Sequence, residues 1–460
     1  MLRLHDTIAS IATMPGEAAV GVIKISGVKS TSIISGIFRA KKKKDIKKVK
    51  TYTLHYGWIM EKSKSGDGVV DEVLVSVMRA PFSYTREDVV EIYSHSGQVV
   101  LNRILELVLR KGARLAQPGE FTRRAFLSGR IDLAQAEAVR DIVKARTDQA
   151  LRLGVAQLKG RLSANIGQIQ DELKDICAGL EADISFPDQV SADRKGLRKS
   201  IKDIQQRIRT LLKNAEEGRF LREGVSCVIC GRANVGKSSL LNMLLKDERV
   251  IVTSSPGTTR DVVEDNINIK GMPLKIYDTA GILEPKDLIS AKAMEKSYAK
   301  IDEADLVLLV FDGSQALCKD DLFLIEKVRQ KRVIFIINKI DLPQKLDARR
   351  LRKYKNTVTK ISALKDRGLD RLEEAIIKAV FKKGLRKADD IFVSNIRHAG
   401  LLKEALERIG DAEDYFTKRY SFDFVFFSLS EALGAISQIT GKSVTDDILD
   451  SIFSNFCIGK

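Results

Sequence analysis

The chain is 460 residues long and 44% hydrophobic, so it can form two to four domains with buried cores. Its 78 basic residues exceed its 61 acidic residues and give a net charge of +17, which predicts either a polyanionic partner, RNA rather than DNA, or a merely basic solvated surface. Five cysteines, an odd number, argue against a disulfide framework, and we find no secretory signal and no apolar stretch long enough to cross a bilayer, so we expect a cytoplasmic protein with no membrane partner.

Residues 1–118 predict a mixed α+β domain. Residues 19–25 and 69–77 have the apolar runs or the alternation of strands, and residues 99–109 place apolar side chains at helical spacing. The densest basic run lies in residues 41–50 and predicts a solvated loop.

The next part of the chain, residues 119–217, contains hardly any strand signal. Its segments 134–145, 151–180 and 201–212 are amphipathic with helical periodicity. The helical pattern returns in residues 381–460, so we expect both parts to form one all-α helical bundle with residues 218–380 inserted into it.

Residues 231–239 read Gly-Arg-Ala-Asn-Val-Gly-Lys-Ser-Ser, a complete G-x-x-x-x-G-K-S phosphate loop between a strand-like run and a helix-like run. Backbone N–H groups of such a loop wrap a polyphosphate. We expect Lys237 to reach the β- and γ-phosphates and the Ser238 hydroxyl to bind Mg²⁺. The predicted nucleotide contacts in this loop are Asn234, Val235, Gly236, Lys237, Ser238 and Ser239.

Three later segments, each near the end of a predicted strand, indicate a guanine nucleotide. Asp278, in Asp278-Thr279-Ala280-Gly281, can hold Mg²⁺ through water, and Gly281 can donate its N–H to the γ-phosphate. A buried Asp341, in Asn338-Lys339-Ile340-Asp341, can accept two hydrogen bonds from guanine that adenine cannot donate. Ser362-Ala363-Leu364 can close over the base. The order of these segments predicts an inserted α/β P-loop GTPase domain; the alternative is an α/β domain that has lost its nucleotide.

The cysteines do not predict a metal or redox site. Cys227 and Cys230 form a C-x-x-C on a predicted strand, where residues three apart face opposite sides, so we interpret them as small core residues. Cys457 begins a Cys-Ile-Gly-Lys end that mimics a prenylation box, but the terminal lysine is wrong for lipidation.

Nearly the whole chain resembles the MnmE (TrmE) family of tRNA-modification GTPases, within the wider TrmE-Era-EngA-like group. The resemblance is carried by residues 80–91, 118–130, 132–138 and 452–460. It implies a potassium-activated GTPase that works with an MnmG-like (GidA) flavoprotein and modifies carbon 5 of the wobble uridine in certain tRNAs. It also implies a homodimer through the N-terminal domain, with G domains that pair on GTP.

The resemblance further implies a tetrahydrofolate derivative, in the 5-formyl or methylene form, as the one-carbon donor bound by the N-terminal domain. The family's folate contacts fall here on Lys24, Glu91, Arg130 and Lys460. Most members carry Arg where Lys24 stands, so a planar fork is replaced by a point charge.

The family's potassium ligands fall on Asn234 and on the oxygen-rich loop 253–259, and Thr259 would complete the Mg²⁺ shell with Ser238. Potassium against the phosphates would neutralise charge that develops in the transition state. In a structural reading, Asn234 only caps its loop. The predicted metal or nucleotide contacts of loop 253–259 are Thr253, Ser254, Ser255, Pro256, Gly257, Thr258 and Thr259.

The chain departs from the family pattern at several positions. Counting from Asp278 without a gap puts Ser290 where the family carries the glutamate that orients the attacking water, and Glu284, Asp287 or Glu295 could take this role only after a local shift. We therefore expect GTP binding but slow hydrolysis. The loop glycine of the family is Arg86 here, and Ser96 stands at a second glycine position, so either residue is strained if its φ is positive. The predicted catalytic residues are Asn234, Lys237, Asp278, Gly281, Ser290 and Cys457.

Two other functions stay open. One is a GTP-dependent switch or RNA-binding assembly factor, and the other is a GTP- and folate-binding scaffold with weak hydrolysis because of Ser290. Cys457 is either a nucleophile near the chemistry or part of an anchored tail.

Overall fold

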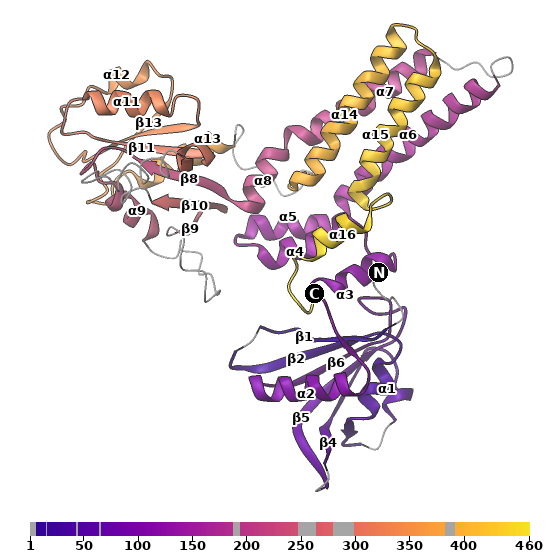
Figure 1. The fold of residues 1–460 in the computed structure, drawn as a ribbon. Helices are drawn as coiled ribbons and strands as arrows, with labels where there is room; N and C mark the ends of the chain where they lie inside the picture. Colours follow the sequence, from indigo (N-terminus) through magenta and orange to yellow (C-terminus); the bar gives the residue numbers. More distant parts are fainter. Residues whose placement is uncertain are drawn as a thin grey trace. The chain divides into compact units, whose positions relative to one another are not determined.

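The computed structural model describes residues 6–14, 16–42, 45–63, 66–186, 194–246, 264–278, 299–381 and 392–460 (Figure 1). The chain forms two compact units. Unit 1 is Met1–Arg140, Gln157–Gln170 and Ile436–Lys460, and unit 2 is Asp141–Ala156 and Asp171–Ala435. The four domain ranges expected from the sequence stay a prediction.

Unit 1 contains a seven-stranded sheet in the order β3-β4-β5-β6-β2-β1-β7. The neighbouring strands pair antiparallel except β1 and β7, which pair parallel. The strands are β1 (Ile8–Ile11), β2 (Ala18–Ser26), β3 (Phe38–Ala40), β4 (Thr53–Ser63), β5 (Gly66–Met78), β6 (Val89–Ser96) and β7 (Arg114–Leu115).

One face of this sheet carries a hydrophobic core, and the opposite face lies outside that core. Alternate residues such as Ile23, Val75 and Ile92 form a core with residues of α1 (Ser30–Ser35) and α2 (Gln98–Arg110). Their neighbours along the strands point to the opposite face, which therefore carries Lys24 and Glu91. The basic run after β3 includes a 3₁₀ turn, Ile46–Lys48, which is anchored by the buried Ile46.

The helical part of unit 1 joins segments that are far apart in the sequence. The helices α3 (Glu120–Leu127), α4 (Leu133–Lys144) and α16 (Asp446–Phe453) share a core that includes Ala125, Leu133 and Phe453. Gly119 is the N-cap of α3, and a Cβ there would lie 2.7 Å from the carbonyl oxygen of Phe453, so the tail can pack this closely only on glycine.

Unit 2 contains the expected α/β sheet, in the order β13-β12-β11-β8-β10-β9, with all neighbours parallel except β9 and β10. The strands are β8 (Val225–Cys230), β9 (Glu264–Ile269), β10 (Met272–Asp278), β11 (Leu306–Asp312), β12 (Val333–Asn338) and β13 (Thr357–Lys360). Its helices within the described residues are α9 (Lys237–Leu245), α11 (Lys319–Lys327), α12 (Ala348–Arg352) and α13 (Leu369–Val380).

The sheet has a hydrophobic core on each face, as expected for a doubly wound domain. Cys227 belongs to one core and Cys230 to the other, and both are fully buried. Burial raises the pKa of both thiols, that of Cys230 to about 12. The structure therefore confirms that the C-x-x-C is two core residues.

The other described helices are α5 (Asp148–Leu158), α6 (Arg161–Ser185), α7 (Arg194–Lys213), α8 (Ala215–Glu223), α14 (Ile396–Thr417) and α15 (Phe422–Thr440). The expected continuous helical run 151–180 is divided between α5 and α6, because Gly160 takes the left-handed φ of 80°.

The expectation that no apolar stretch is long enough to cross a bilayer was wrong as stated, because α15 is long and apolar enough to span one. Length and composition alone are weak evidence for a membrane span, because core helices of soluble proteins meet the same criterion. Val425, Leu429 and Ala432 of α15 are buried in the protein.

Candidate functional site

The phosphate loop follows β8 directly and ends in α9, as the motif requires. Gly231 crosses β11 so closely that a Cβ would lie 2.5 Å from the carbonyl oxygen of Val310. Asn234 takes a left-handed φ of 61°, which asparagine tolerates better than most residues. Gly236, at φ 97°, is the N-cap of α9, so the positive end of this helix faces the loop.

The loop is locked to the Asn-Lys-x-Asp segment by side chains. Asn338 donates from Nδ2 to the carbonyl oxygen of Val235 at 2.9 Å, and its Oδ1 accepts from the backbone N–H of Ala363 at 3.0 Å. A Cβ on Gly236 would lie 2.2 Å from Asn338 Nδ2. One buried amide therefore joins the three motif segments around 235, 338 and 363.

Lys339 adds a second lock that involves a residue missed by the sequence analysis. Its Nζ donates to the carbonyl oxygen of Asn234 at 2.8 Å and pairs with Asp312 Oδ2 at 2.7 Å. Asp312 ends β11, and its carboxylate also accepts from Ser314. Its position at the end of an apolar strand was the signal that could have identified it.

Within the loop, Lys237 and the two serines are placed differently. The Lys237 side chain is buried, and its Nζ donates to the carbonyl oxygen of Arg232 at 2.8 Å. Ser238 and Ser239 lie exposed in the first turn of α9. Val235 is buried and anchors the loop. The arrangement leaves the Ser238 hydroxyl accessible to a cation.

The segments predicted to contact the guanine base differ from the prediction in one respect. Asp341 is exposed, not buried, because the turn after β12 carries it to the surface. Its Oδ1 accepts a hydrogen bond from Ser362 Oγ at 2.5 Å, and this bond holds the pKa of Asp341 below its usual value. Ile340 is held by a backbone bond to Ile361, while Leu364 is 78% exposed. The carboxylate is thus ionised and oriented in an open position.

Several predicted residues lie outside the described part of the chain. They are Thr253, Ser254, Ser255, Pro256, Gly257, Thr258, Thr259, Thr279, Ala280, Gly281 and Ser290. Asp278 is described only as the last residue of β10, paired in register with Ile229 of β8. Their roles stay predictions.

In unit 1, the structure brings together all the residues predicted to contact folate. Lys24 and Glu91 are register partners on β2 and β6, with 3.9 Å between Nζ and Oε1. Burial lowers the pKa of Lys24, the charge of Glu91 opposes this, and the nearby charges of Lys460 and Arg130 lower it further. Three cations and one carboxylate therefore share a site on the sheet face opposite α1 and α2.

Two aromatic residues complete this cationic site. The Lys24 ammonium lies 4.7 Å from the ring centroid of Tyr84 and 5.1 Å from that of Phe121, and the Arg130 guanidinium lies 4.8 Å from that of Tyr84. Both aromatics lie in segments that carry the family resemblance, but nothing in their spacing marked them as site residues. Tyr93 orients Glu91 through a 2.6 Å hydrogen bond to Oε2.

The loop that carries Tyr84 is fixed to α3 by Arg86 and Glu87. Glu87 pairs with the buried Arg124 of α3 at 3.0 Å. Arg86 has a left-handed φ of 59°, which is the condition under which strain is expected there, and its Nη1 donates to the carbonyl oxygen of Ser128 at 2.8 Å. Ser96, by contrast, does not have a positive φ and pairs with Ala18 of β2.

The chain's tail packs against the same region. Gly459, at φ 96°, comes so close to the end of β1 that a Cβ would lie 2.9 Å from Ala12 Cα. Phe456 is buried in the α3–α4–α16 core, whereas Cys457 is exposed. The anchored-tail role of this segment therefore has a structural basis, and a reactive role for Cys457 stays a prediction.

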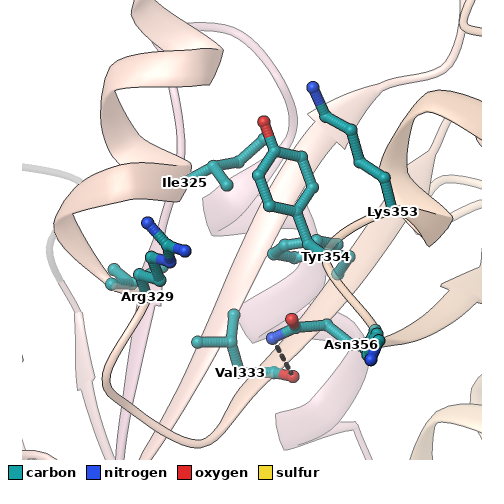
Figure 2. A pocket seen from close by; sticks show the side chains of 9 residues that line it. Ile325, Arg329, Val333, Lys353, Tyr354 and Asn356 are labelled. Atoms are coloured by element: carbon teal, nitrogen blue, oxygen red, sulfur yellow. Dashed lines mark hydrogen bonds between the residues drawn. The ribbon is translucent and has the colours of Figure 1, made fainter.

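A cavity of about 280 Å³ lies elsewhere in the α/β domain, away from all of these residues (Figure 2). It is lined by residues near the amino end of β12, such as Val333, whereas the nucleotide motifs follow the carboxyl ends of the strands. None of its lining residues was predicted to bind a ligand.

A phosphate loop between a central parallel strand and a helix, interlocked with an Asn-Lys-x-Asp segment, defines a P-loop GTPase domain. The family model described as "GTP-binding protein TrmE N-terminus" matches residues 7–130, and the "MnmE helical domain" model matches residues 133–457. The curated "tRNA modification GTPase MnmE" of Alkaliphilus metalliredigens is 45% identical over 99% of this chain and all of its own length. Its namesake from Bacillus subtilis is 43% identical over the same shares.

Among solved structures, Aquifex aeolicus Era bound to GDP and AlF4⁻ is 30% identical and covers 40% of this chain and 66% of its own, with a TM-score of 0.29. The chain belongs to the MnmE (TrmE) family of tRNA-modification GTPases. It is a multidomain GTP-binding enzyme, a GTPase of tRNA modification.

Proposed function

We propose that this GTPase is activated by potassium and acts with an MnmG-like flavoprotein to modify carbon 5 of the wobble uridine in certain tRNAs, with a folate-derived one-carbon unit. The observation that carries the folate part is the convergence of Glu91, Arg130 and Lys460 around Lys24, with Lys24 and Arg130 over the ring of Tyr84. Cations suit the carboxylates of a folate tail, and Glu91 can accept from the N–H groups of a pterin ring.

The oxygen donors predicted around the nucleotide suit two metal ions. Ser238, with Thr259 and Asp278, would hold Mg²⁺, while Asn234, Thr253, Ser255 and Thr258 would hold potassium. When bound, these ions supply positive charge against the phosphates as negative charge moves toward the leaving group. The chain's own part is to hold the nucleotide through the loop backbone and Lys237 and to fix guanine through Asp341.

A homodimer through the N-terminal domain is part of the proposal. The sheet face opposite α1 and α2 leaves apolar side chains partly exposed, with Leu54 at 57% and Leu74 at 39%. Pairing of two such faces would bury these residues close to the strands that carry Lys24 and Glu91. The proposed location is the cytoplasm.

The test is titration of the full-length chain with 5-formyltetrahydrofolate by calorimetry. We expect saturable binding to the wild type and binding at least about 10-fold weaker for Lys24→Ala, since charge-assisted contacts are worth roughly 1.5–3 kcal/mol. Lys29→Ala removes an exposed lysine from the same unit and serves as the matched control. Failure of the wild type to bind would refute the folate part of the proposal.

The alternative function, a GTP- and RNA-binding switch or scaffold with weak hydrolysis, rests on Ser290. Steady-state hydrolysis in potassium chloride and sodium chloride at equal ionic strength separates the two. A large potassium-specific rate supports the proposed enzyme, whereas a slow rate in both salts with tight GTP binding supports the alternative.

A further inference from the structure

Two basic segments of the α/β domain meet at the amino ends of neighbouring strands. This end of the sheet is opposite the end that carries the nucleotide motifs. Residues 327–332 read Lys-Val-Arg-Gln-Lys-Arg and connect α11 to β12. Residues 349–355 read Arg-Arg-Leu-Arg-Lys-Tyr-Lys and comprise most of α12 and the first residues of the turn toward β13. Because β12 and β13 are parallel neighbours, their amino ends lie together, and both segments line the cavity of Figure 2. We call these two segments the basic edge.

The short helix α12 turns its charges outward around a single anchor. Leu351 is fully buried, whereas Arg349, Arg350, Arg352 and Lys353 are exposed. Acidic neighbours pair with three of the arginines and leave the other cations of the second segment in solvent. Arg329 pairs with Glu326, Arg332 with Glu216 and Arg349 with Asp347, but the ion pairs found among the described residues include none of Arg350, Arg352, Lys353 and Lys355. A dense array of solvated cations attracts a polyanion.

The cavity within the basic edge combines an apolar floor with an aromatic wall. Its floor is formed by buried side chains, Ile325, Val328, Val333 and Phe335. The Tyr354 ring is braced edge-on by Phe335 at 6.1 Å between centroids, and the Lys353 ammonium lies 4.8 Å from the Tyr354 centroid. Figure 2 shows the tyrosine ring with the Arg329 guanidinium to one side and the lysine ammonium to the other.

We propose that the basic edge binds RNA, with its cations on backbone phosphates and one unstacked base held in the cavity against Tyr354. The proposal rests on the proposed function in one respect, namely that the RNA is the tRNA this enzyme modifies. Sequence-tolerant recognition of single-stranded RNA uses this combination of a basic track and an aromatic platform.

RNA fits the basic edge better than an acidic protein segment does. Five cations occur in the seven residues 349–355, and they extend past the cavity along α12, as a run of phosphates requires. The cavity takes a single flat group, whereas a docked peptide helix needs a longer apolar groove. The edge lies away from the phosphate loop, so RNA binding there leaves the nucleotide site open.

The first test measures the affinity of the full-length chain for a fluorescently labelled tRNA with a wobble uridine, by anisotropy, across a range of potassium chloride concentrations. The variant combines Arg350→Ala, Arg352→Ala and Lys353→Ala. We expect affinity roughly 10-fold or more weaker, and a slope of log K against log salt that is shallower by about two to three, because each lost phosphate contact removes about one unit.

The matched control combines Lys42→Ala, Lys47→Ala and Lys50→Ala, which removes the same charge from exposed positions of the other dense basic run. We expect this control to keep wild-type affinity. Equal losses in both triple variants, or a loss only in the control, would overturn the proposal. Binding of a fluorescent GDP should be unchanged in all variants, which shows that the α/β domain is intact.

The second test addresses the base pocket. Tyr354→Leu keeps apolar bulk against Phe335 but removes the aromatic face, and we expect tRNA affinity about 5- to 100-fold weaker with an unchanged salt slope. Tyr354→Phe keeps the face and should bind like the wild type. Wild-type affinity in the leucine variant would contradict the base pocket.

The outcomes separate this inference from the proposed function. If the wild type binds no tRNA, the role of this chain in tRNA recognition fails along with the basic edge. If the wild type binds tRNA but the α12 triple variant binds it equally well, only the basic edge fails. If that variant keeps tRNA affinity but no longer binds the MnmG-like flavoprotein, the edge is a protein-docking surface and the proposal is wrong.

Discussion

The nucleotide site of unit 2 and the cationic site of unit 1 are built in different ways. The first consists mainly of backbone, and its glycines, Asn338 and Lys339 hold a loop in one shape. The second consists of side chains from separate segments, namely β2, β6, the loop after α3 and the tail. A backbone site tolerates almost no substitution within its loop, whereas a side-chain site can be retuned one residue at a time.

The largest effect is expected in the backbone site, from Gly236→Ala. A methyl group there meets Asn338 Nδ2 at 2.2 Å, on a backbone with φ 97°. Strain of about 1–3 kcal/mol plus the displaced amide should weaken GDP binding more than about 100-fold, as measured with a fluorescent nucleotide. Gly410→Ala in α14 meets no neighbour and should leave GDP affinity unchanged. Retained affinity in Gly236→Ala would show that the interlock is not rigid.

The next effect concerns chemistry in the same domain. Ser290→Glu should raise the hydrolysis rate at saturating GTP in potassium chloride by about 10²-fold, because it restores a carboxylate that orients water. Ser290→Ala supplies no side chain that can orient water, so it should stay slow. An unchanged rate with glutamate would mean that another residue positions the water.

For the side-chain site, Lys24→Arg should improve the ligand's fit. A planar guanidinium stacks on Tyr84 and Phe121 and can bind a carboxylate through two parallel bonds, so we expect 5-formyltetrahydrofolate affinity to rise by roughly 3- to 10-fold. Calorimetry of the wild type and the variant measures this directly. Weaker binding by the variant would show that the lysine ammonium makes a contact with the ligand that a planar guanidinium cannot make.

A pH series tests the guanine end. The hydrogen bond from Ser362 lowers the pKa of Asp341, so the carboxylate stays ionised until the pH falls through that lowered value. Only the ionised form accepts both guanine N–H groups, so GDP affinity should fall at acidic pH. Ser362→Ala should move this loss to higher pH, because the pKa returns toward its ordinary value. Coincident pH profiles for the wild type and the variant would contradict this role of Ser362.

The smallest effect is expected at Arg86. Glycine relieves the left-handed strain but loses the bond to Ser128, two terms of about 1 kcal/mol each, so Arg86→Gly should change stability little. Arg86→Ala loses the bond and keeps the strain, so it should be less stable than the glycine variant by about 1 kcal/mol. Thermal unfolding compares the two, and equal stabilities would show that φ is not strained in the wild type.

The difference between the two sites also explains what the sequence could predict. Phosphate-loop residues 231–239 are contiguous, so their spacing alone predicted the strand, the loop and the helix that the structure shows. The residues around Lys24 come from positions tens to hundreds of residues apart, and only the family resemblance grouped them. Local patterns predict sites made by adjacent backbone, but they cannot show which side chains a sheet brings together.

Smaller differences have the same origin. Asp341 was expected to be buried, but burial depends on the path of a turn that no periodicity describes. Tyr84 and Phe121 were read only as parts of family motifs, since an aromatic residue in a sequence does not reveal whether a cation lies over its ring. The division between α5 and α6 depends on the φ of one glycine within an otherwise helical pattern.

The core shared by α3, α4 and α16 has a consequence for biosynthesis. Arg123 of α3 forms an ion pair with Asp450 of α16, so this core needs residues that are synthesised more than 300 positions apart. On the ribosome, the strands and helices of residues 225–380 are complete before α16 emerges, and domains generally fold as units during synthesis. We therefore expect a nascent chain in which the GTPase domain is already folded while the core shared by α3 and α16 is still incomplete. The need for chaperones should be greatest during this interval.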